Sequence, residues 1–183
     1  MSEELLIQHC APTLAGLKTG SLVTAPCPDV PAVLAQLRQW NRRLSPKGVQ
    51  ILPLRFTPGH VLLYLYRSRQ LESDLRQRDA AAILRKKGYP DTATGRCLAQ
   101  LMAHLRQDAE FPHEIGLFLG YPPEDVQGFM ENKAARHKLA GCWKVYGDVD
   151  AAQRTFARYK KCTRVYLDQW RRGATLERLT VSS

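Results

Sequence analysis

Six consecutive apolar or aromatic residues, Val61-Leu62-Leu63-Tyr64-Leu65-Tyr66, place the strongest constraint on how this chain folds. A strand that is apolar on both faces is typical of the interior of a sheet that is covered on both sides. The run follows another β-like segment, Val49 to Phe56, across Thr57-Pro58-Gly59-His60, where Pro before Gly is the order of a type II turn. The sequence therefore predicts a β-hairpin in which residues 61–67 form an interior strand.

Two further segments, residues 20–25 and 141–146, are expected to join the same sheet. Apolar residues at helical spacing predict helices between and after these strands, at residues 30–44, 70–87, 94–107 and from about 148 to 171. This order matches a split βαβ, ferredoxin-like antiparallel sheet. We therefore expect an α+β fold in which residues 1–183 form a single domain with helices on the sheet, a helical insertion at about 90–135 and a loose tail at 180–183.

Composition excludes several classes of protein. The 183 residues are 44% hydrophobic, which is enough for a core, and 27 Lys and Arg against 17 Asp and Glu give a net charge of +10. No apolar run is long enough to cross a membrane, and the acidic start Met1-Ser2-Glu3-Glu4 is unlike a secretory signal. Five cysteines without a CxxC pair suit neither a disulfide framework nor a zinc knuckle. The expected protein is basic, reduced and cytoplasmic.

Three ordered motifs resemble a known family. They are HCAPTL with KTG at residues 9–20, FPHEIG with GYP, EDV and GF at 111–129, and CWKVYG with YKKC at 142–162. Together they are similar to an uncharacterised bacterial family, a domain of unknown function that occurs mostly in anaerobes. The resemblance implies a cytoplasmic, strictly reduced setting and implies no activity.

Cys10 is the candidate nucleophile, with His9 beside it. It precedes a helical turn expected from Ala11-Pro12, and a helix N-terminus together with a nearby cation lowers the pKa of a thiol. Lys18 supplies that cation, and Lys18 and Thr19 are candidate ligand-binding residues. The alternative is that Cys10 is a small buried apolar residue of the core.

Cys10, Cys142 and Cys162 are candidate metal ligands. With His9 or His113 they would offer the soft sulfur and nitrogen donors that iron, zinc or a haem-type cofactor prefers. The spacing does not show that these positions converge, and the alternative is that Cys142 and Cys162 pack in the core. The sequence therefore identifies no cofactor.

Residues 114–129 are similar to a helix-turn-helix, with small glycines and a turn between two short helices. DNA recognition would bring the start of the second helix to the groove, where Glu124 and Asp125 repel phosphates. The alternative is a helical hairpin packed on the sheet. His113 is a candidate ligand-binding residue; adjacent positions on a helix diverge by about 100°, so it is not expected to act with Glu114 as an acid–base pair.

Basic residues concentrate near the C-terminus. Residues 131–172 hold 11 Lys or Arg and 4 acidic residues. Lys160 and Lys161 lie on one predicted helix, and Lys144 and Tyr146 would extend the surface along the neighbouring strand. Such a surface attracts an acidic protein or an anionic ligand, and nucleic acid less favourably, although a solvated helix face is the alternative.

The sequence favours a binding or accessory protein that uses this basic surface and a cysteine-containing pocket in redox or metal metabolism. The alternatives are a small thiol-dependent enzyme that uses Cys10 and a nucleic-acid-binding regulator.

Overall fold

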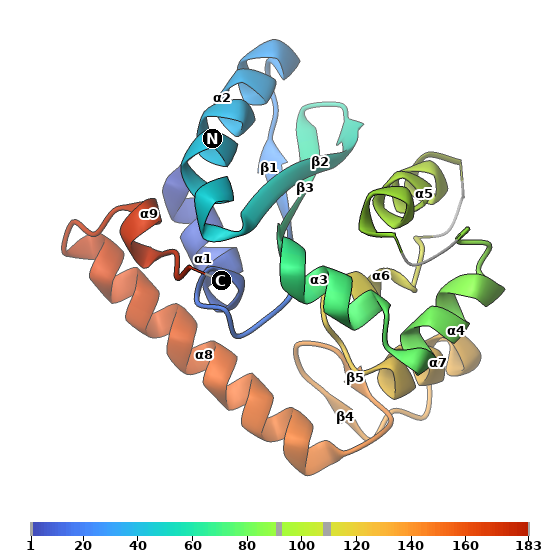
Figure 1. Cartoon of the computed structure of the whole chain (residues 1–183). Helices are drawn as coiled ribbons and strands as arrows, with labels where there is room; N and C mark the ends of the chain where they lie inside the picture. Colours follow the sequence, from blue (N-terminus) through green and yellow to red (C-terminus); the bar gives the residue numbers. More distant parts are fainter. Residues whose placement is uncertain (1, 91–92, 108–110, 183) are drawn as a thin grey trace. The chain divides into compact units, whose positions relative to one another are not determined.

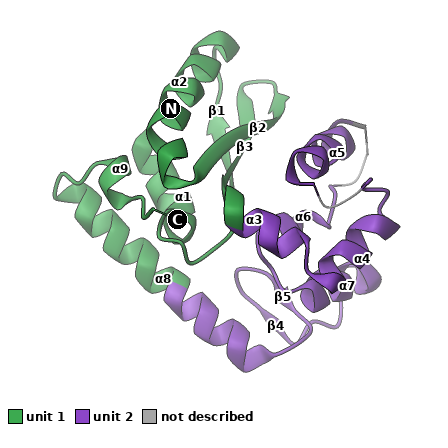
Figure 2. Cartoon of the chain, in the orientation of Figure 1, with its two compact units in different colours: residues 1–69, 159–183 green, residues 70–158 purple. Residues whose placement is uncertain are grey.

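The computed structural model describes residues 2–90, 93–107 and 111–182, and the chain divides into two compact units (Figure 2). Unit 1 comprises residues 1–69 and 159–183, and unit 2 comprises residues 70–158. A single domain with an insertion at about 90–135 stays a prediction.

Unit 1 contains the predicted hairpin. Strands β2 (Val49–Thr57) and β3 (His60–Arg67) are antiparallel, and Gly59 in the turn has a φ of 74°, as the third position of a type II turn requires. Strand β1 (Gly20–Pro26) pairs with the other side of β3, so the strand order is β1-β3-β2 (Figure 1). The prediction that residues 61–66 lie in an interior strand is confirmed.

The core of unit 1 lies between this sheet and its helices. Inward-facing residues of neighbouring strands pair directly, such as Val23 with Leu63. Helix α1 (Glu3–Leu14) begins after Ser2, whose Oγ accepts a hydrogen bond from the Leu5 amide, and helix α2 (Val30–Leu44) is followed by the short η1 (Ser45–Lys47). The helices and strands bury one cluster, which includes Leu6, Ile7, Leu14, Leu37, Trp40, Leu44, Ile51, Val61 and Leu65.

The C-terminal segment completes unit 1. Helix α8 (Val149–Arg171) enters this unit at Tyr159, and its apolar side, which includes Trp170, packs against the core. Helix α9 (Leu176–Leu179) lies beside α1 (Figure 1) and buries Leu176 and Leu179 in the same cluster.

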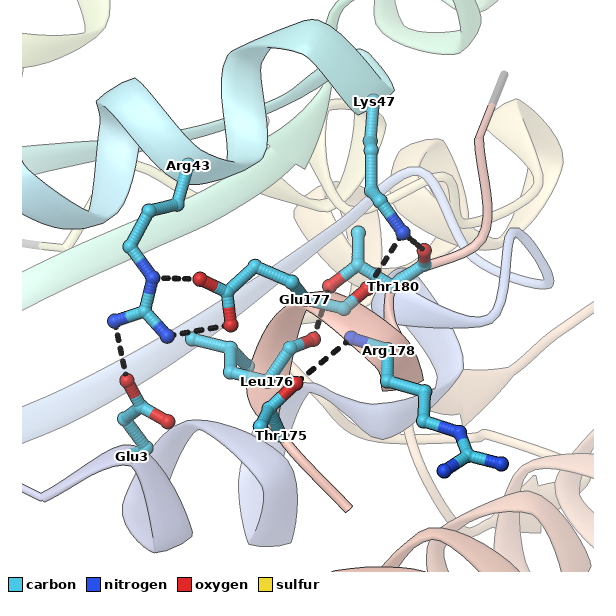
Figure 3. A network of polar contacts seen from close by, with 8 residues as sticks. All are labelled: Glu3, Arg43, Lys47, Thr175, Leu176, Glu177, Arg178 and Thr180. Carbon is cyan, nitrogen blue, oxygen red and sulfur yellow. Dashed lines mark hydrogen bonds and ion pairs between the residues drawn. The ribbon is translucent and has the colours of Figure 1, made fainter.

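Ion pairs and hydrogen bonds hold this segment in place (Figure 3). Arg43 of α2 pairs with Glu3 at 2.7 Å and also with Glu177. The Lys47 Nζ donates to the carbonyl oxygens of Glu177 at 2.6 Å and Thr180 at 2.7 Å. Thr180 is only 1% exposed and the backbone of Val181 is hydrogen-bonded to Leu14 and Arg67, so the prediction of a loose tail is wrong for these two residues; Ser182 is exposed, and Ser183 lies outside the described residues.

Arg67 is a buried cation that joins three segments of unit 1. Its Nε donates to the carbonyl oxygen of Thr13 at 2.6 Å, and its Nη2 donates to those of Leu14 at 2.5 Å and Val181 at 2.8 Å. The first two carbonyls belong to the last turn of α1, where the helix itself offers no N–H donors for them. A cation at that end also complements the helix dipole.

Unit 2 is mostly helical. Its helices are α3 (Ser68–Leu75), which starts at the end of unit 1, α4 (Arg78–Lys86), α5 (Thr94–Gln107), α6 (Ile115–Phe118), α7 (Pro123–Asn132) and the first part of α8. The apolar stripe predicted for residues 94–107 is confirmed, because Leu98, Leu101 and Leu105 are buried.

The prediction that residues 141–146 add a strand to the main sheet is wrong. Strand β4 (Leu139–Ala140) pairs with β5 (Lys144–Val145) in a separate two-stranded sheet. The amides of Tyr146 and Gly147 donate to the Asp125 carboxylate, so this backbone is bound by a side chain of α7 instead of a neighbouring strand. The described residues thus form an α+β fold with a three-stranded antiparallel sheet and a small hairpin, and a ferredoxin-like split βαβ is not shown.

Candidate functional site

A pocket of about 370 Å³ lies within unit 2. It is bounded by residues of α6, α7, the β4–β5 hairpin and the segment before α6. Its lining is Phe111, His113, Ile115, Gly116, Leu119, Tyr121, Asp125, Val126, Phe129, Ala140, Gly141, Trp143 and Lys144. Apolar and aromatic side chains dominate this set, and the volume is within the range of about 300–1,000 Å³ that is usual for small-molecule sites.

Glycines let the walls of the pocket approach closely. A Cβ on Gly116 of α6 would lie 2.8 Å from Cγ2 of Val126 on α7, and a Cβ on Gly128 would lie 2.5 Å from the ring of Tyr146. Both distances are too short for a real side chain. The two helices and the hairpin can therefore pack at this separation only because these positions are glycine.

Asp125 fixes the hairpin that forms one wall. It is 3% exposed, and its Oδ1 accepts from the backbone amides of Tyr146 at 2.7 Å and Gly147 at 2.8 Å. Its Oδ2 accepts from the indole Nε1 of Trp143 at 2.7 Å. A carboxylate with three such donors forms charge-assisted hydrogen bonds, which are stronger than neutral ones. Asp125 therefore sets the position of Trp143 in the pocket wall.

Aromatic contacts order the walls further. The rings of Tyr121 and Trp143 stack with centroids 4.8 Å apart, and Phe156 meets Trp143 edge-on at 4.5 Å. Two other lining residues, His113 and Phe129, meet edge-on with their ring centroids 4.8 Å apart. Such ring pairs add to the stabilisation from burial alone, so the aromatic walls are held in defined orientations.

Lys144 belongs to the pocket lining, and its ammonium contacts a histidine that lies outside the lining. Its Nζ lies 3.4 Å from Nε2 of His137, whose Nδ1 lies 3.0 Å from the carbonyl oxygen of Ala134. Because a carbonyl only accepts, Nδ1 is the donor in that contact, and Nε2 is the ring nitrogen that faces the Lys144 ammonium. Among the residues that the structure describes, no carboxylate pairs with Lys144.

A second polar cluster in unit 2 was not predicted from the sequence. Glu114 is 3% exposed, and its Oε1 accepts from the Tyr89 hydroxyl at 3.1 Å and from Nδ1 of His104 at 3.0 Å. Nε2 of His104 lies 2.9 Å from the Gln100 amide nitrogen, which donates to it. The expected divergence of His113 and Glu114 is confirmed, since one lines the pocket and the other turns into this cluster.

The predicted activation of Cys10 is wrong. Helix α1 begins at Glu3, so Cys10 lies in its second half instead of at an N-terminus, and the side chain is fully buried in the core of unit 1. Burial raises the pKa of its thiol to about 12, and the lowering effects of Lys18 and of a hydrogen bond with Ser21 are smaller. His9 is exposed on the opposite side of the helix surface. Cys10 is thus placed as a core residue.

The other predicted ligand residues are dispersed. Lys18 is half-buried in unit 1, and Thr19 is buried, with its carbonyl oxygen accepting from the Arg67 amide. Tyr146 is not part of the pocket lining; its ring packs at Gly128 and its hydroxyl donates to the Ala135 carbonyl. Lys160 and Lys161 are exposed on the part of α8 that belongs to unit 1. Of the predicted ligand-binding residues, only His113 and Lys144 meet in one pocket.

The cysteines do not assemble a metal site among the described residues. Cys142 is exposed, while Cys162 is buried and its pKa is raised by burial to about 11. Across residues 2–90, 93–107 and 111–182, His, Cys, Asp and Glu form no group of three or more that could hold a metal ion. No cysteine lines the described pocket, so the predicted cysteine-containing pocket is not the one observed.

The segment predicted to be similar to a helix-turn-helix forms a helical hairpin. Its first helix, α6, has only four residues, whereas α7 agrees with the predicted second helix. At the start of α7, Glu124 is exposed, but Asp125 is buried and binds the β4–β5 hairpin. The beginning of α7 is therefore engaged inside unit 2.

Comparisons with known proteins give one match. The sequence profile of a family described as a protein of unknown function, DUF3793, matches residues 6–180. Searches of curated proteins and of solved structures each gave no match. The match confirms the resemblance that the three motifs indicated. No helix in the described parts of the chain has the length and apolar content needed to cross a bilayer.

Proposed function

The chain belongs to the DUF3793 family, and because that family has no known function, we propose from unit 2 alone that the protein binds a small organic molecule in its aromatic pocket. The observation that carries the proposal is a preformed apolar cavity of about 370 Å³ with few polar groups at its wall. Concave, mostly apolar sites with a few placed polar groups are the usual form of a small-molecule site.

The pocket is also rigidly built, which supports a binding role. The three hydrogen bonds to Asp125 hold the hairpin, and the close packing at Gly116 and Gly128 holds α6 and α7. A preformed site loses little conformational entropy when a ligand enters, so more of the contact free energy appears as affinity. A binding role agrees with the binding or accessory protein that the sequence favoured, but the proposed site is a pocket whose lining contains no cysteine.

The two alternative functions have weaker support. A thiol-dependent enzyme would need an accessible thiolate, whereas Cys10 is fully buried and its pKa is raised. A nucleic-acid-binding regulator would need the start of α7 to face a groove, whereas Asp125 there is bound to Trp143 and the backbone of Tyr146 and Gly147.

Ligand-observed NMR with 2-naphthamide, a neutral aromatic probe, tests the proposed binding. Ala140 lines the pocket, so Ala140→Phe fills part of the cavity and should abolish saturation transfer to the probe. Ala99→Phe, at an exposed position of α5 in the same unit, is the matched control and should bind as the wild type does. Equal binding to both variants, or no binding to the wild type at millimolar probe, would refute the pocket as a binding site.

A second proposal concerns exposed basic residues of unit 1, namely Lys160, Lys161 and Arg164 of α8 and Arg172 directly after it. None of the four forms an ion pair with any residue that the structure describes, and Val165 between them is 43% exposed. We propose that this basic surface of α8 contacts an acidic protein partner, because a negative surface would complement it and steer the encounter. An apolar contact at Val165 favours a protein over a phosphate backbone.

A further inference from the structure

The lining of the pocket in unit 2 is mostly apolar, and it also favours a ligand of one charge. Lys144 lines it and, among the described residues, has His137 as its hydrogen-bond partner and no carboxylate. An ammonium has three donors, and His137 uses one of them at 3.4 Å. The remaining donors leave Lys144 able to bind an acceptor that enters the pocket.

The carboxylate of Asp125, which also lines the pocket, does not favour a cationic ligand. Both oxygens of Asp125 already accept hydrogen bonds, from the Tyr146 and Gly147 amides and from the Trp143 indole, and the residue is 3% exposed. A ligand ammonium would have to displace one of these donors. A ligand anion has no such competition, because it would approach Lys144 and leave the Asp125 hydrogen bonds intact.

Aromatic walls alone would also suit a quaternary ammonium, which binds over ring faces. In this pocket the ring of Trp143 is already stacked with Tyr121 and makes a T-shaped contact with Phe156, so these rings do not form an open cage. A cation would in addition meet the charge of Lys144 in a mostly apolar site, where electrostatic repulsion is strong. The lining therefore disfavours a cationic ligand.

From these contacts we infer that the ligand is a flat aromatic monocarboxylate whose ring contacts the aromatic walls and whose carboxylate binds Lys144. This rests on the proposed binding function and adds the ligand's charge and its contact residue. A cavity of about 370 Å³ is at the small end of the usual range, which suits one or two fused rings and a single charged group.

Three probes that share a naphthalene ring and differ in charge test the inference by calorimetry: 2-naphthoate, 2-naphthamide and 2-naphthyltrimethylammonium. We expect the wild type to bind 2-naphthoate about tenfold or more tightly than the amide, which corresponds to one charge-assisted contact. Binding of the ammonium probe should be weakest. Lys144→Met removes the charge but keeps an apolar stem, so it should remove most of the difference in affinity between the carboxylate and the amide.

Two further variants serve as controls. Lys160→Met removes an exposed charge in unit 1 and should keep the full preference for the carboxylate, and Lys144→Arg should keep most of it. If the amide binds but the carboxylate gains nothing, or if the ammonium probe binds most tightly, the inferred charge preference is wrong while the binding function stands. If neither the amide nor the carboxylate binds, the proposed function fails as well. The wild-type series decides the question even if a variant does not fold.

Discussion

Asp125 gives the sharpest test of how unit 2 is built. The variant Asp125→Asn keeps one carbonyl oxygen, which can still accept from the Tyr146 and Gly147 amides, but turns an NH₂ group toward the Trp143 indole. It therefore loses one charge-assisted hydrogen bond and weakens two, since a hydrogen bond to a charged group contributes about 1.5–3 kcal/mol. We expect a loss of about 2–3 kcal/mol in the local opening free energy, and a larger loss for Asp125→Ala, which removes all three acceptor contacts.

Hydrogen exchange of the backbone amides measures this directly. In Asp125→Ala the amides of Tyr146 and Gly147 should exchange about a hundredfold or more faster, because about 1.4 kcal/mol corresponds to a factor of ten. In Asp125→Asn they should stay partly protected, while the indole proton of Trp143 becomes the more affected group. The opening free energies of amides in the core of unit 1 should be unchanged.

Glu124→Gln is the matched control, because it removes the same charge from the same first turn of α7. Glu124 is exposed and lies against Gly147, and Gln keeps the shape of this side chain, so the variant loses chiefly the favourable interaction with the helix dipole, about 0.3–1 kcal/mol. The difference between the two variants thus isolates the hydrogen bonds from the charge. Equal effects of Asp125→Asn and Glu124→Gln, or full protection of both amides in Asp125→Ala, would refute the assignment of Asp125 as the residue that holds the hairpin.

Three further outcomes are expected. Cys10 should resist alkylation in the folded protein while the exposed Cys142 reacts. Because the folded pKa of Cys10 is about 12 and its ordinary value is 9.0, the stability contributed by the neutral thiol is complete below about pH 9 and is lost toward about pH 12, at up to about 1.4 kcal/mol per pH unit. Urea titrations of Cys10→Ala should show a smaller loss of stability over this pH range. Arg67→Met should lower the free energy of unfolding in a urea titration by about 2–4 kcal/mol, because three carbonyl oxygens lose a charged donor. The side chain of Arg43 is 32% exposed, so Arg43→Met should lower the same free energy by about 1 kcal/mol or less. Equal losses in the two variants would contradict the role of Arg67 in unit 1. The double variant Lys160→Glu with Lys161→Glu should elute from a cation-exchange matrix at a lower salt concentration than the control double variant Arg85→Glu with Lys86→Glu on α4. It should change the free energy of unfolding by no more than about 0.5 kcal/mol. Equal shifts in elution would argue against a localised basic surface.

The sequence alone determined the local structure well where pattern and turn chemistry agree. The apolar run at residues 61–66 gave an interior strand, because a strand with two apolar faces can satisfy both only inside a covered sheet. Pro58-Gly59 gave the turn, since glycine supplies the positive φ that the hairpin requires. The motifs also indicated the family correctly.

The sequence predicted only part of the candidate site. His113 and Lys144 were named as ligand residues, but nothing in their separation along the chain showed that they line one pocket with Trp143 and Phe129. Their meeting depends on the close approach of α7 to its neighbours and on the hydrogen bonds of Asp125, which are contacts between segments distant in sequence. Spacing along a chain carries no information on such contacts.

Only the tertiary structure decided the state of Cys10 and the pairing of residues 141–146. A helix N-terminus activates a thiol only if the helix starts there, and α1 starts seven residues earlier, so burial raises the pKa of Cys10 instead. Residues 141–146 alternate like a strand, yet the amides that follow Val145 bind the Asp125 carboxylate and do not pair with the main sheet. Local pattern sets which conformations a segment can adopt, whereas its backbone hydrogen bonds go to whichever acceptor the folded chain brings within reach.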